Sequence, residues 1–381
     1  MTGRKDPGAA PVRPLAAGTG GGKVAVSVIG RTDDLRITAV RALIAPQLLV
    51  EQIPVDAAAL AVVGSARQAI HRVLHGAEDR LLVVAGPCSI HDYDAALEYA
   101  TRLAGEARRL EGELLVVMRV YFEKPRTTVG WKGFINDPHL DGSFAMNEGL
   151  RLARKLLLEV NRLGLACGTE FLDLLSPQYI SDLIAWGAIG ARTTESQSHR
   201  QLASGLSCPV GFKNGTDGSV KVAVDALRAA AAPHAFMGMT KTGQAAIFET
   251  AGNEDCHVIL RGGRAPNYDA ASIEAASREL AAAGQAPRLM VDFSHANCSK
   301  DYLRQRDVAA DVAAQLAAGE DRIMGVMVES NLNPGRQDLV AGQAPAHGIS
   351  ITDACLGWED SVRLLETLAE GVRARRLARS E

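Results

Sequence analysis

The sequence predicts an α/β protein built as a (β/α)8 TIM barrel, and three observations lead to that fold class. Eight short apolar runs alternate with helical patterns along most of the chain. No GxGxxG motif follows the first of these runs, which disfavours the competing architecture, an open doubly wound sheet. Aromatic residues make up only 4% of the chain, so the core must consist of Ala, Val, Leu and Ile, as in buried parallel strands.

The overall composition excludes several classes of protein. The 381 residues include 41 Lys and Arg against 44 Asp and Glu, so the net charge is −3. A chain with this charge has no overall electrostatic attraction for nucleic acid or an anionic membrane. There is no apolar run of membrane-spanning length and no secretory signal pattern, which predicts a cytoplasmic protein. The six cysteines are scattered without a CxxC pair, and we expect reduced thiols.

Two segments precede the expected barrel. Residues 1–30 are rich in Gly, Pro and Ala, bury too little apolar surface to offset chain entropy, and are expected to form a disordered tail. Residues 31–75 form an N-terminal extension with a helical pattern through Val62, Ala66, Ile70 and Val73. The catalytic barrel is then expected over residues 76–378.

The barrel strands and one insertion can be placed by their apolar runs. The eight strands are expected at Leu81–Gly86, Leu114–Val120, Leu165–Phe171, Gly187–Arg192, Pro209–Lys213, His257–Gly263, Arg288–Ser294 and Ile323–Ser330. Residues 235–250 predict two short strands around Thr242 and Gly243, a β-hairpin inserted between barrel strands 5 and 6.

Every predicted strand has a polar side chain that is capable of chemistry near or just after its carboxyl end. In chain order these side chains are Cys88, Arg119 with Lys124, Glu170, Arg192, Lys213, Arg261, His295 and Glu329, and Asp353 follows in the last loop. The carboxyl ends of barrel strands surround the active site in this fold. Each residue alone has a structural explanation, but so much charge in one concavity would be costly to desolvate without ligands.

The strand-end residues divide into two kinds of site. Cys88, His295, Glu329 and Asp353 form a mixed N/O/S set that suits one divalent ion, Mn²⁺, Fe²⁺, Co²⁺ or Zn²⁺. The cations Arg119, Lys124, Arg126, Arg192, Lys213 and Arg261 indicate an anion site, because guanidinium groups grip carboxylate and phosphate. The Lys124–Thr128 turn, KPRTT, presents cations and hydroxyls together, which favours two phosphorylated substrates.

Eight motifs together resemble one known family. They are GPCSIHD (Gly86–Asp92), MRVYFEKPRTTVGWKG (Met118–Gly133), GARTTESQ (Gly190–Gln197), SGLSCPVGFKNGTDG (Ser204–Gly218), DCHVILRGG (Asp255–Gly263), DFSHANCSK (Asp292–Lys300), GVMVES (Gly325–Ser330) and ITDACLGWED (Ile351–Asp360). From about Asp33 to Arg375 the chain resembles the type I 3-deoxy-D-arabino-heptulosonate 7-phosphate (DAHP) synthases.

The resemblance implies a transferase that starts the shikimate pathway of aromatic amino-acid synthesis. Such an enzyme condenses phosphoenolpyruvate with erythrose 4-phosphate and water, giving DAHP and phosphate. The family pattern places the metal on Cys88, His295, Glu329 and Asp353, phosphoenolpyruvate on Arg119, Lys124, Arg192, Lys213 and Arg261, and the erythrose phosphate on Arg126 and Thr127. Lys124 would protonate the aldehyde oxygen, which the metal polarises, and Glu170 would position the water.

The resemblance also implies regulation. In the resembling enzymes an N-terminal extension and an inserted hairpin form an inhibitor site for aromatic amino acids and an interface of a dimer or tetramer. The matching positions here are Asp173, Pro177, Leu202, Leu206, Ser207, Phe236 and Gly238. The missing side chain at Gly238 is expected to leave room for a phenolic hydroxyl, which favours tyrosine over phenylalanine as the inhibitor.

Two alternative functions and one side reaction stay open at this point. The chain could condense phosphoenolpyruvate with another sugar phosphate, such as arabinose 5-phosphate, although KPRTT argues against this. It could also be a catalytically silent regulatory barrel, although no expected ligand residue is missing. Cys355 lies two residues after Asp353 and is expected to be a buried thiol, with oxidation to a Cys88–Cys355 disulfide as the sharper alternative.

Overall fold

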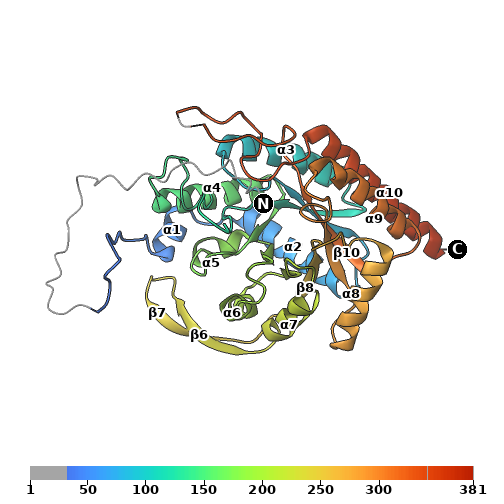
Figure 1. Ribbon diagram of the computed structural model, residues 1–381, viewed down its shortest axis with the longest axis horizontal. Helices are drawn as coiled ribbons and strands as arrows, with labels where there is room; N and C mark the ends of the chain where they lie inside the picture. The colour runs from blue at the N-terminus through green and yellow to red at the C-terminus, as the bar shows by residue number, and fades with distance from the viewer. Residues whose placement is uncertain (1–31, 341, 381) are drawn as a thin grey trace, which may run out of the picture.

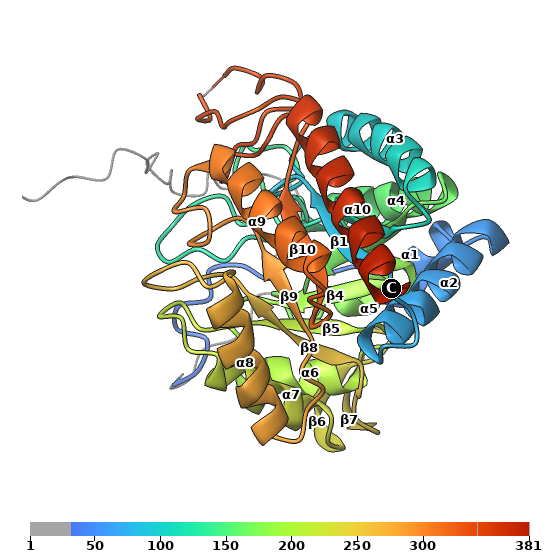
Figure 2. The same cartoon turned by 90° about the vertical axis from the view of Figure 1, so that its right-hand side faces the viewer.

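The computed structural model describes residues 32–340 and 342–380 of the chain (Figure 1). The predicted disordered tail, residues 1–30, lies outside the described residues. Eight parallel strands close into a barrel, and helices surround it (Figures 1 and 2). The predicted fold class is confirmed, whereas the exact domain boundaries stay a prediction.

The barrel is a single closed ring of hydrogen-bonded strands. Its strands are β1 (Leu81–Gly86), β2 (Leu114–Arg119), β3 (Ala166–Glu170), β4 (Trp186–Ile189), β5 (Val210–Lys213), β8 (Cys256–Leu260), β9 (Leu289–Asp292) and β10 (Ile323–Glu329). The order around the ring is β1-β10-β9-β8-β5-β4-β3-β2. Parallel pairing of β1 with β10 brings Gly86 opposite Glu329, so residues that follow these strands emerge at the same end.

The helices follow the strands in the expected alternation. They are α1 (Pro46–Gln52), α2 (Ala57–Leu74), α3 (Tyr93–Arg109), α4 (Met146–Arg162), α5 (Pro177–Ile180), α6 (Gln197–Gly205), α7 (Lys221–Ala230), α8 (Ala270–Ala282), α9 (Gln305–Ala317) and α10 (Trp358–Ser380). Asp56, Asp92 and Asp269 accept hydrogen bonds from first-turn backbone amides and cap α2, α3 and α8.

Alternating side chains of the strands build two apolar cores. On β1, Leu81 and Val83 face the surrounding helices, whereas Leu82 and Val84 point into the barrel. The barrel interior also contains Trp186. Because both faces of each strand are buried, the strands read as continuous apolar runs, as the sequence pattern indicated.

Helix α2 covers the end of the barrel at which the strands begin. Its residues Ile70 and Val73 pack into the interior core with Leu82 and Met324, which lie early in β1 and β10. Arg67 of the same helix donates hydrogen bonds to the carbonyl of Ile184 just before β4. In Figure 1, α2 lies across the middle of the ring of helices. The opposite end of the barrel, where the strands finish, is left for the site.

The inserted hairpin lies outside the barrel between β5 and β8, as expected. Its strands β6 (His234–Met239) and β7 (Ala245–Thr250) pair antiparallel and run beside α6 and α7 (Figure 1). The backbone N–H of Gln47 in α1 donates to the carbonyl of Lys241 at 2.7 Å. The N-terminal extension and the hairpin therefore contact each other.

Some strands end earlier than the sequence predicted. The fourth strand was expected to run to Arg192 but ends at Ile189, because the amides of Thr193 and Thr194 turn back to the carbonyl of Gly190. Among the described helices, none alone is long and apolar enough to cross a membrane, and only the bent pair α1–α2 meets that test by length and composition.

Candidate active site

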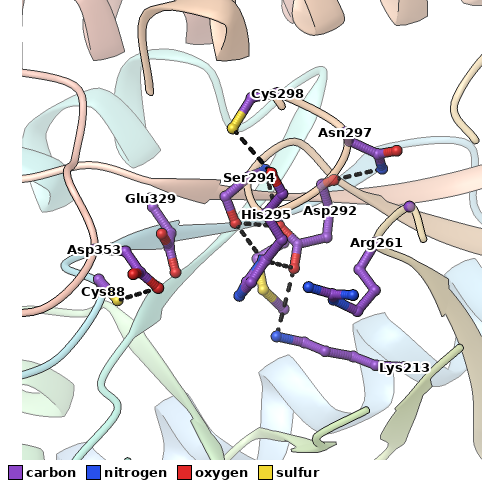
Figure 3. A network of polar contacts seen from close by, with 12 residues as sticks. Cys88, Lys213, Arg261, Asp292, Ser294, His295, Asn297, Cys298, Glu329 and Asp353 are labelled. Atoms are coloured by element: carbon purple, nitrogen blue, oxygen red, sulfur yellow. Dashed lines mark hydrogen bonds and ion pairs between the residues drawn. The ribbon is translucent and has the colours of Figure 1, made fainter. Parts of the chain in front are cut away.

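Three metal-ligand candidates from distant parts of the chain meet where β1 and β10 end. One ligand atom each from Cys88, Glu329 and Asp353 lies within 4.8 Å of the other two. Cys88 Sγ lies 3.7 Å from Asp353 Oδ2 (Figure 3). Cys88 and Glu329 are buried, whereas Asp353 is exposed. A thiol and two carboxylates at this spacing can hold a divalent transition metal.

His295, the fourth expected ligand, lies beside this group but is not one of the three. Figure 3 shows its ring between Asp292 on one side and Glu329 with Asp353 on the other. Its Nδ1 lies 2.7 Å from Ser294 Oγ and 3.0 Å from Asp292 Oδ2. A metal-binding histidine commonly gives its other ring nitrogen to a carboxylate. This pairing leaves Nε2 of His295 for a ligand.

Lys124 lies against the expected metal ligand Cys88. Its Nζ donates to Cys88 Sγ at 3.1 Å and to the Cys88 carbonyl at 3.0 Å. Burial raises the pKa of the Cys88 thiol, and nearby Glu329 adds to the rise although Lys124 opposes it. Burial alone would lower the pKa of Lys124, but Cys88 and Glu329 reverse the direction and raise it. Lys124 is therefore a charged proton donor next to the ligand set.

Arg119 is bound on all sides by protein groups. Its guanidinium donates to the carbonyls of Pro87 and Cys88 at 3.0 and 3.1 Å and to Glu329 Oε1 at 2.9 Å. It also lies over the ring of Tyr121, with 3.5 Å between Cζ and the ring centroid. Arg119 is only 1% exposed, so its charge orients the ligand Glu329 and the loop that carries Cys88.

Lys213 of β5 lies between two carboxylates, Glu170 at the end of β3 and Asp292 at the end of β9. Its Nζ lies 3.5 Å from Glu170 Oε2. It also lies 3.4 Å from Asp292 Oδ2, a contact drawn in Figure 3. Burial alone would raise the pKa of Glu170, but Lys213, Lys124 and Arg119 outweigh it and lower that pKa. A Cβ at position 190 would lie 2.8 Å from Glu170 Oε1, so Gly190 makes room for this carboxylate. Glu170 therefore stays ionised.

Asp292 is a site residue that the sequence reasoning missed. It ends β9, is fully buried, and contacts both Lys213 and His295. Burial opposes its ionisation, but His295 and Lys213 hold the pKa of Asp292 well below its usual range. The predicted seventh strand, Arg288–Ser294, ran past Asp292, whereas β9 ends at it; the available signal was a lone carboxylate within the apolar run of RLMVDFS.

The remaining expected substrate residues lie around this buried group. Arg126, Thr127 and Arg192 are exposed, and Arg261 is half-buried. Figure 3 shows the guanidinium of Arg261 beside Lys213. Arg126 donates through Nε to the carbonyl of Trp131 at 2.8 Å, which anchors the KPRTT turn. These cations leave donors available to solvent, as binding of free anions requires.

The seven expected inhibitor residues come from three neighbouring elements. They are Asp173 and Pro177 at the start of α5, Leu202, Leu206 and Ser207 at the end of α6, and Phe236 and Gly238 on β6. Ser204 of α6 and Thr250 of β7 are joined by a hydroxyl hydrogen bond of 2.7 Å. The hairpin is thus fastened to α6.

The space expected at Gly238 is not free, and this premise of the sequence analysis was wrong. A Cβ at Gly238 would lie 2.2 Å from Cδ2 of Phe248, the residue on the neighbouring strand β7. The rings of Phe236 and Phe248 lie 6.0 Å apart, centroid to centroid. The ring of Phe248 therefore fills the room that was assigned to a phenolic hydroxyl.

Comparison with known proteins gives consistent results. The sequence model of the "DAHP synthetase I family" matches residues 52–366. The chain is 60% identical to the "Phospho-2-dehydro-3-deoxyheptonate aldolase, Phe-sensitive" of Escherichia coli (strain K12), over 91% of this chain and 99% of that protein. It is 54% identical to a "Trp-sensitive" relative from Enterobacter agglomerans, over 91% of this chain and 100% of that protein.

A solved structure is similar over the whole barrel. The phospho-2-dehydro-3-deoxyheptonate aldolase from Francisella tularensis SCHU S4 superposes with a TM-score of 0.87 at 49% sequence identity. The match covers 89% of this chain and 99% of that one.

Proposed function

We propose that the residues where the barrel strands end catalyse DAHP synthesis with one bound divalent metal ion. The chain belongs to the DAHP synthetase I family and is a DAHP synthase, the enzyme of the first step of the shikimate pathway. The reaction joins C3 of phosphoenolpyruvate to the aldehyde carbon of erythrose 4-phosphate, adds water at C2 and releases phosphate. The observation that carries the proposal is the meeting of Cys88, Glu329 and Asp353 beside Lys124 where the strands end.

The chemistry of the donor set supports a metal at this place. Cys88, Glu329 and Asp353 would hold the ion, and His295 would complete the set through Nε2 while Asp292 keeps its Nδ1. Such an ion supplies Lewis acidity toward a substrate oxygen when it is bound. A thiolate ligand favours Mn²⁺, Fe²⁺, Co²⁺ or Zn²⁺ over Mg²⁺, and the native ion is left open.

The protein groups divide the remaining work. Lys124 donates a proton to the oxygen of the aldehyde as the new C–C bond forms, because its ammonium is charged and already makes hydrogen bonds in the site. Ionised Glu170 accepts a hydrogen bond from the attacking water and orients it. Phosphoenolpyruvate and the departing phosphate are bound by Arg192, Lys213 and Arg261. The phosphate of erythrose 4-phosphate is bound by Arg126 and Thr127. Phosphoenolpyruvate is expected to contact Arg119 and Lys124 as well, and Arg119 also fixes Glu329 through its hydrogen bond of 2.9 Å.

The proposal is tested by following phosphate release with chelated enzyme and with added metal. We expect activity only with phosphoenolpyruvate, erythrose 4-phosphate and metal together, and none with arabinose 5-phosphate in place of the erythrose phosphate. Cys88→Ala should abolish both activity and the response to metal, and Arg192→Ala should mainly raise KM for phosphoenolpyruvate. A chelated Cys88→Ala enzyme with full activity would refute the metal site.

Regulation and assembly are the less direct part of the proposal. The Phe-sensitive and Trp-sensitive names of the relatives support inhibition by an aromatic amino acid. We expect the inhibitor between α5, α6 and β6, without a preference for tyrosine now that Phe248 fills the space at Gly238. A homodimer or homotetramer and a cytoplasmic location remain predictions.

A further inference from the structure

We propose a second divalent-cation site at the opposite end of the barrel, formed by His71, His75 and Asp255. One ligand atom from each of these residues lies within 4.8 Å of the other two. Asp255 Oδ1 lies 2.7 Å from His71 Nδ1 and 2.8 Å from His75 Nε2. Two imidazoles and a carboxylate are a donor set typical of zinc sites that keep one position open.

The backbone fixes the directions of the three side chains before any ion binds. His71 and His75 are four residues apart near the end of α2, so they share one face of the helix. Their rings lie 4.3 Å apart, centroid to centroid. Asp255 directly precedes β8; its amide donates to Asn253 Oδ1 and its carbonyl accepts from Val210. The carboxylate therefore stands on the rigid barrel rather than on a free loop.

The spacing of the ligand atoms needs only a small adjustment to hold an ion. Tetrahedral zinc with bonds near 2 Å separates its ligand atoms by about 3.3 Å. The present contacts of 2.7 and 2.8 Å are about half an ångström shorter, as hydrogen bonds are. The side chains of His71, His75 and Asp255 are 46%, 41% and 22% exposed, so they have room to move apart. Water can then fill the remaining position.

The surrounding charges permit a cation. The donor set consists of two imidazoles and one carboxylate. Arg67 and Arg72 line the same pocket, of about 380 Å³, and would repel an ion. However, Arg67 turns its guanidinium to the carbonyls of Ser181 and Ile184, and Arg72 is paired with Glu78 at 3.0 Å. Imidazole ligands favour zinc, nickel or cobalt over magnesium or calcium.

A bound ion at this place would fasten α2 to the barrel. Helix α2 covers the interior core, and a metal bridge from its last turn to the start of β8 joins two segments far apart in the chain. The site is on the far end of the barrel from Cys88 and contains none of the catalytic groups. It therefore does not depend on the proposed reaction mechanism.

Counting bound Zn²⁺ after equilibrium dialysis of the full chain tests the proposal. We expect about two ions per chain for the wild type, and about one for either Cys88→Ala or His75→Ala, because each removes one site. The matched control is His139→Ala, which removes an exposed histidine that pairs with a single carboxylate, Glu148, at 3.0 Å. This variant should keep both ions.

Thermal unfolding gives a second reading that does not involve the catalytic metal. Zn²⁺ should raise the Tm of Cys88→Ala and leave the Tm of the Cys88→Ala/His75→Ala double variant unchanged. His75→Ala should keep the wild-type turnover rate. Equal counts in wild type and His75→Ala, or equal Tm shifts in the two Cys88→Ala proteins, would overturn the proposal; a single ion in the wild type that His75→Ala loses would instead count against the site at Cys88.

Discussion

At the scale of single residues, Asp292 contacts both the proposed metal ligand His295 and the proposed anion-binding residue Lys213. It lies 3.0 Å from His295 and 3.4 Å from Lys213. A carboxylate behind a ligating histidine fixes the tautomer and the orientation of the ring. Asp292 is therefore a positioning residue, since it acts on the site through His295 and Lys213.

Replacing Asp292 should weaken metal binding more than it harms the chemistry. We expect Asp292→Asn to lower metal affinity about 10- to 100-fold, with kcat largely recovered at saturating metal. Equilibrium dialysis and rate measurements over a range of metal concentrations separate the two effects. Ser294→Ala is the comparison variant: it removes hydroxyl contacts to Asp292 Oδ1 at 2.6 Å and to His295 Nδ1 at 2.7 Å but leaves the charge of Asp292, so it should lower metal affinity less than Asp292→Asn. Unchanged metal affinity in Asp292→Asn would contradict the role.

Cys88 and Cys355 form a second residue pair with a testable outcome. Both thiols are free and fully buried, and the backbone N–H of Cys88 donates to Cys355 Sγ at 3.3 Å. Burial raises the pKa of Cys355, which slows its oxidation, but the two sulfurs lie on adjacent loops. We expect a Cys88–Cys355 disulfide only in chelated, oxidised enzyme, detected by mass spectrometry under non-reducing conditions. Saturating metal should prevent it by occupying Cys88; equal amounts with and without metal would contradict this view.

At the scale of elements, the hairpin shows what sequence patterns can and cannot reveal. The alternation of apolar residues around Thr242 and Gly243 was enough to predict two strands between the fifth and sixth barrel strands. The packing of Phe248 over Gly238 was not predictable, because it depends on the register of β6 with β7. A missing side chain in the sequence is therefore no proof of empty space.

The barrel strands carried most of the information about the site. Cys88, Glu170, Lys213 and Glu329 could be placed because each follows or ends a run that is apolar on both faces. Asp292 also ends a barrel strand, but the sequence pattern was interpreted in favour of His295, three residues later. The contacts of Arg119 with Glu329 and Tyr121 could not be predicted from the sequence, because predicting them requires knowing the order of the strands around the barrel.

Shortening Phe248 should change regulation by the hairpin. In Phe248→Val the ring no longer covers Gly238, and an aromatic amino acid can enter between β6 and α6. We expect about tenfold stronger inhibition, equivalent to 1.4 kcal/mol, by at least one of phenylalanine, tyrosine and tryptophan. Inhibition curves for all three amino acids measure this. Ile247→Val trims the adjacent residue on the other face of β7 and should leave the curves unchanged, and identical curves for Phe248→Val would exclude this site.

At the scale of the whole molecule, exposed apolar side chains indicate self-association. Met237 and Ile247 are 90% and 74% exposed and lie opposite each other on the hairpin. Leu35, Ile37 and Val40 of the N-terminal extension are also exposed. Exposed apolar residues such as the Met237–Ile247 pair are candidates for a contact between subunits, and we predict that the hairpin lies in one.

Charging the hairpin should separate the subunits. We expect a Met237→Glu/Ile247→Glu double variant to be monomeric at concentrations where the wild type is a dimer or tetramer, since association would bury two charges. Light scattering after size-exclusion chromatography measures the mass. Leu377→Glu on α10, where the leucine is 69% exposed, is the matched control and should not change the mass. A monomeric wild type would disprove the assembly.

The free energy of unfolding should depend on pH through the titration of Glu123. This carboxyl is 4% exposed, and burial together with Asp173 raises its pKa from 4.5 to about 7, although Ser176 donates a hydrogen bond to it at 2.9 Å. Because the folded protein holds this proton more tightly than the unfolded chain, its contribution to stability is complete below pH 4.5 and is lost as pH rises to 7. The loss is about 3 kcal/mol.

Glu123→Gln removes this titration, so its free energy of unfolding relative to the wild type should rise by about 2.5 kcal/mol between pH 5 and pH 8. Urea unfolding of both proteins at the two pH values gives this difference, and other titrating groups cancel because they are common to both. The exposed carboxyl of Glu111 offers a control, since Glu111→Gln should show no such rise. An equal difference between Glu123→Gln and the wild type at both pH values would mean that Glu123 is ionised in the folded barrel throughout.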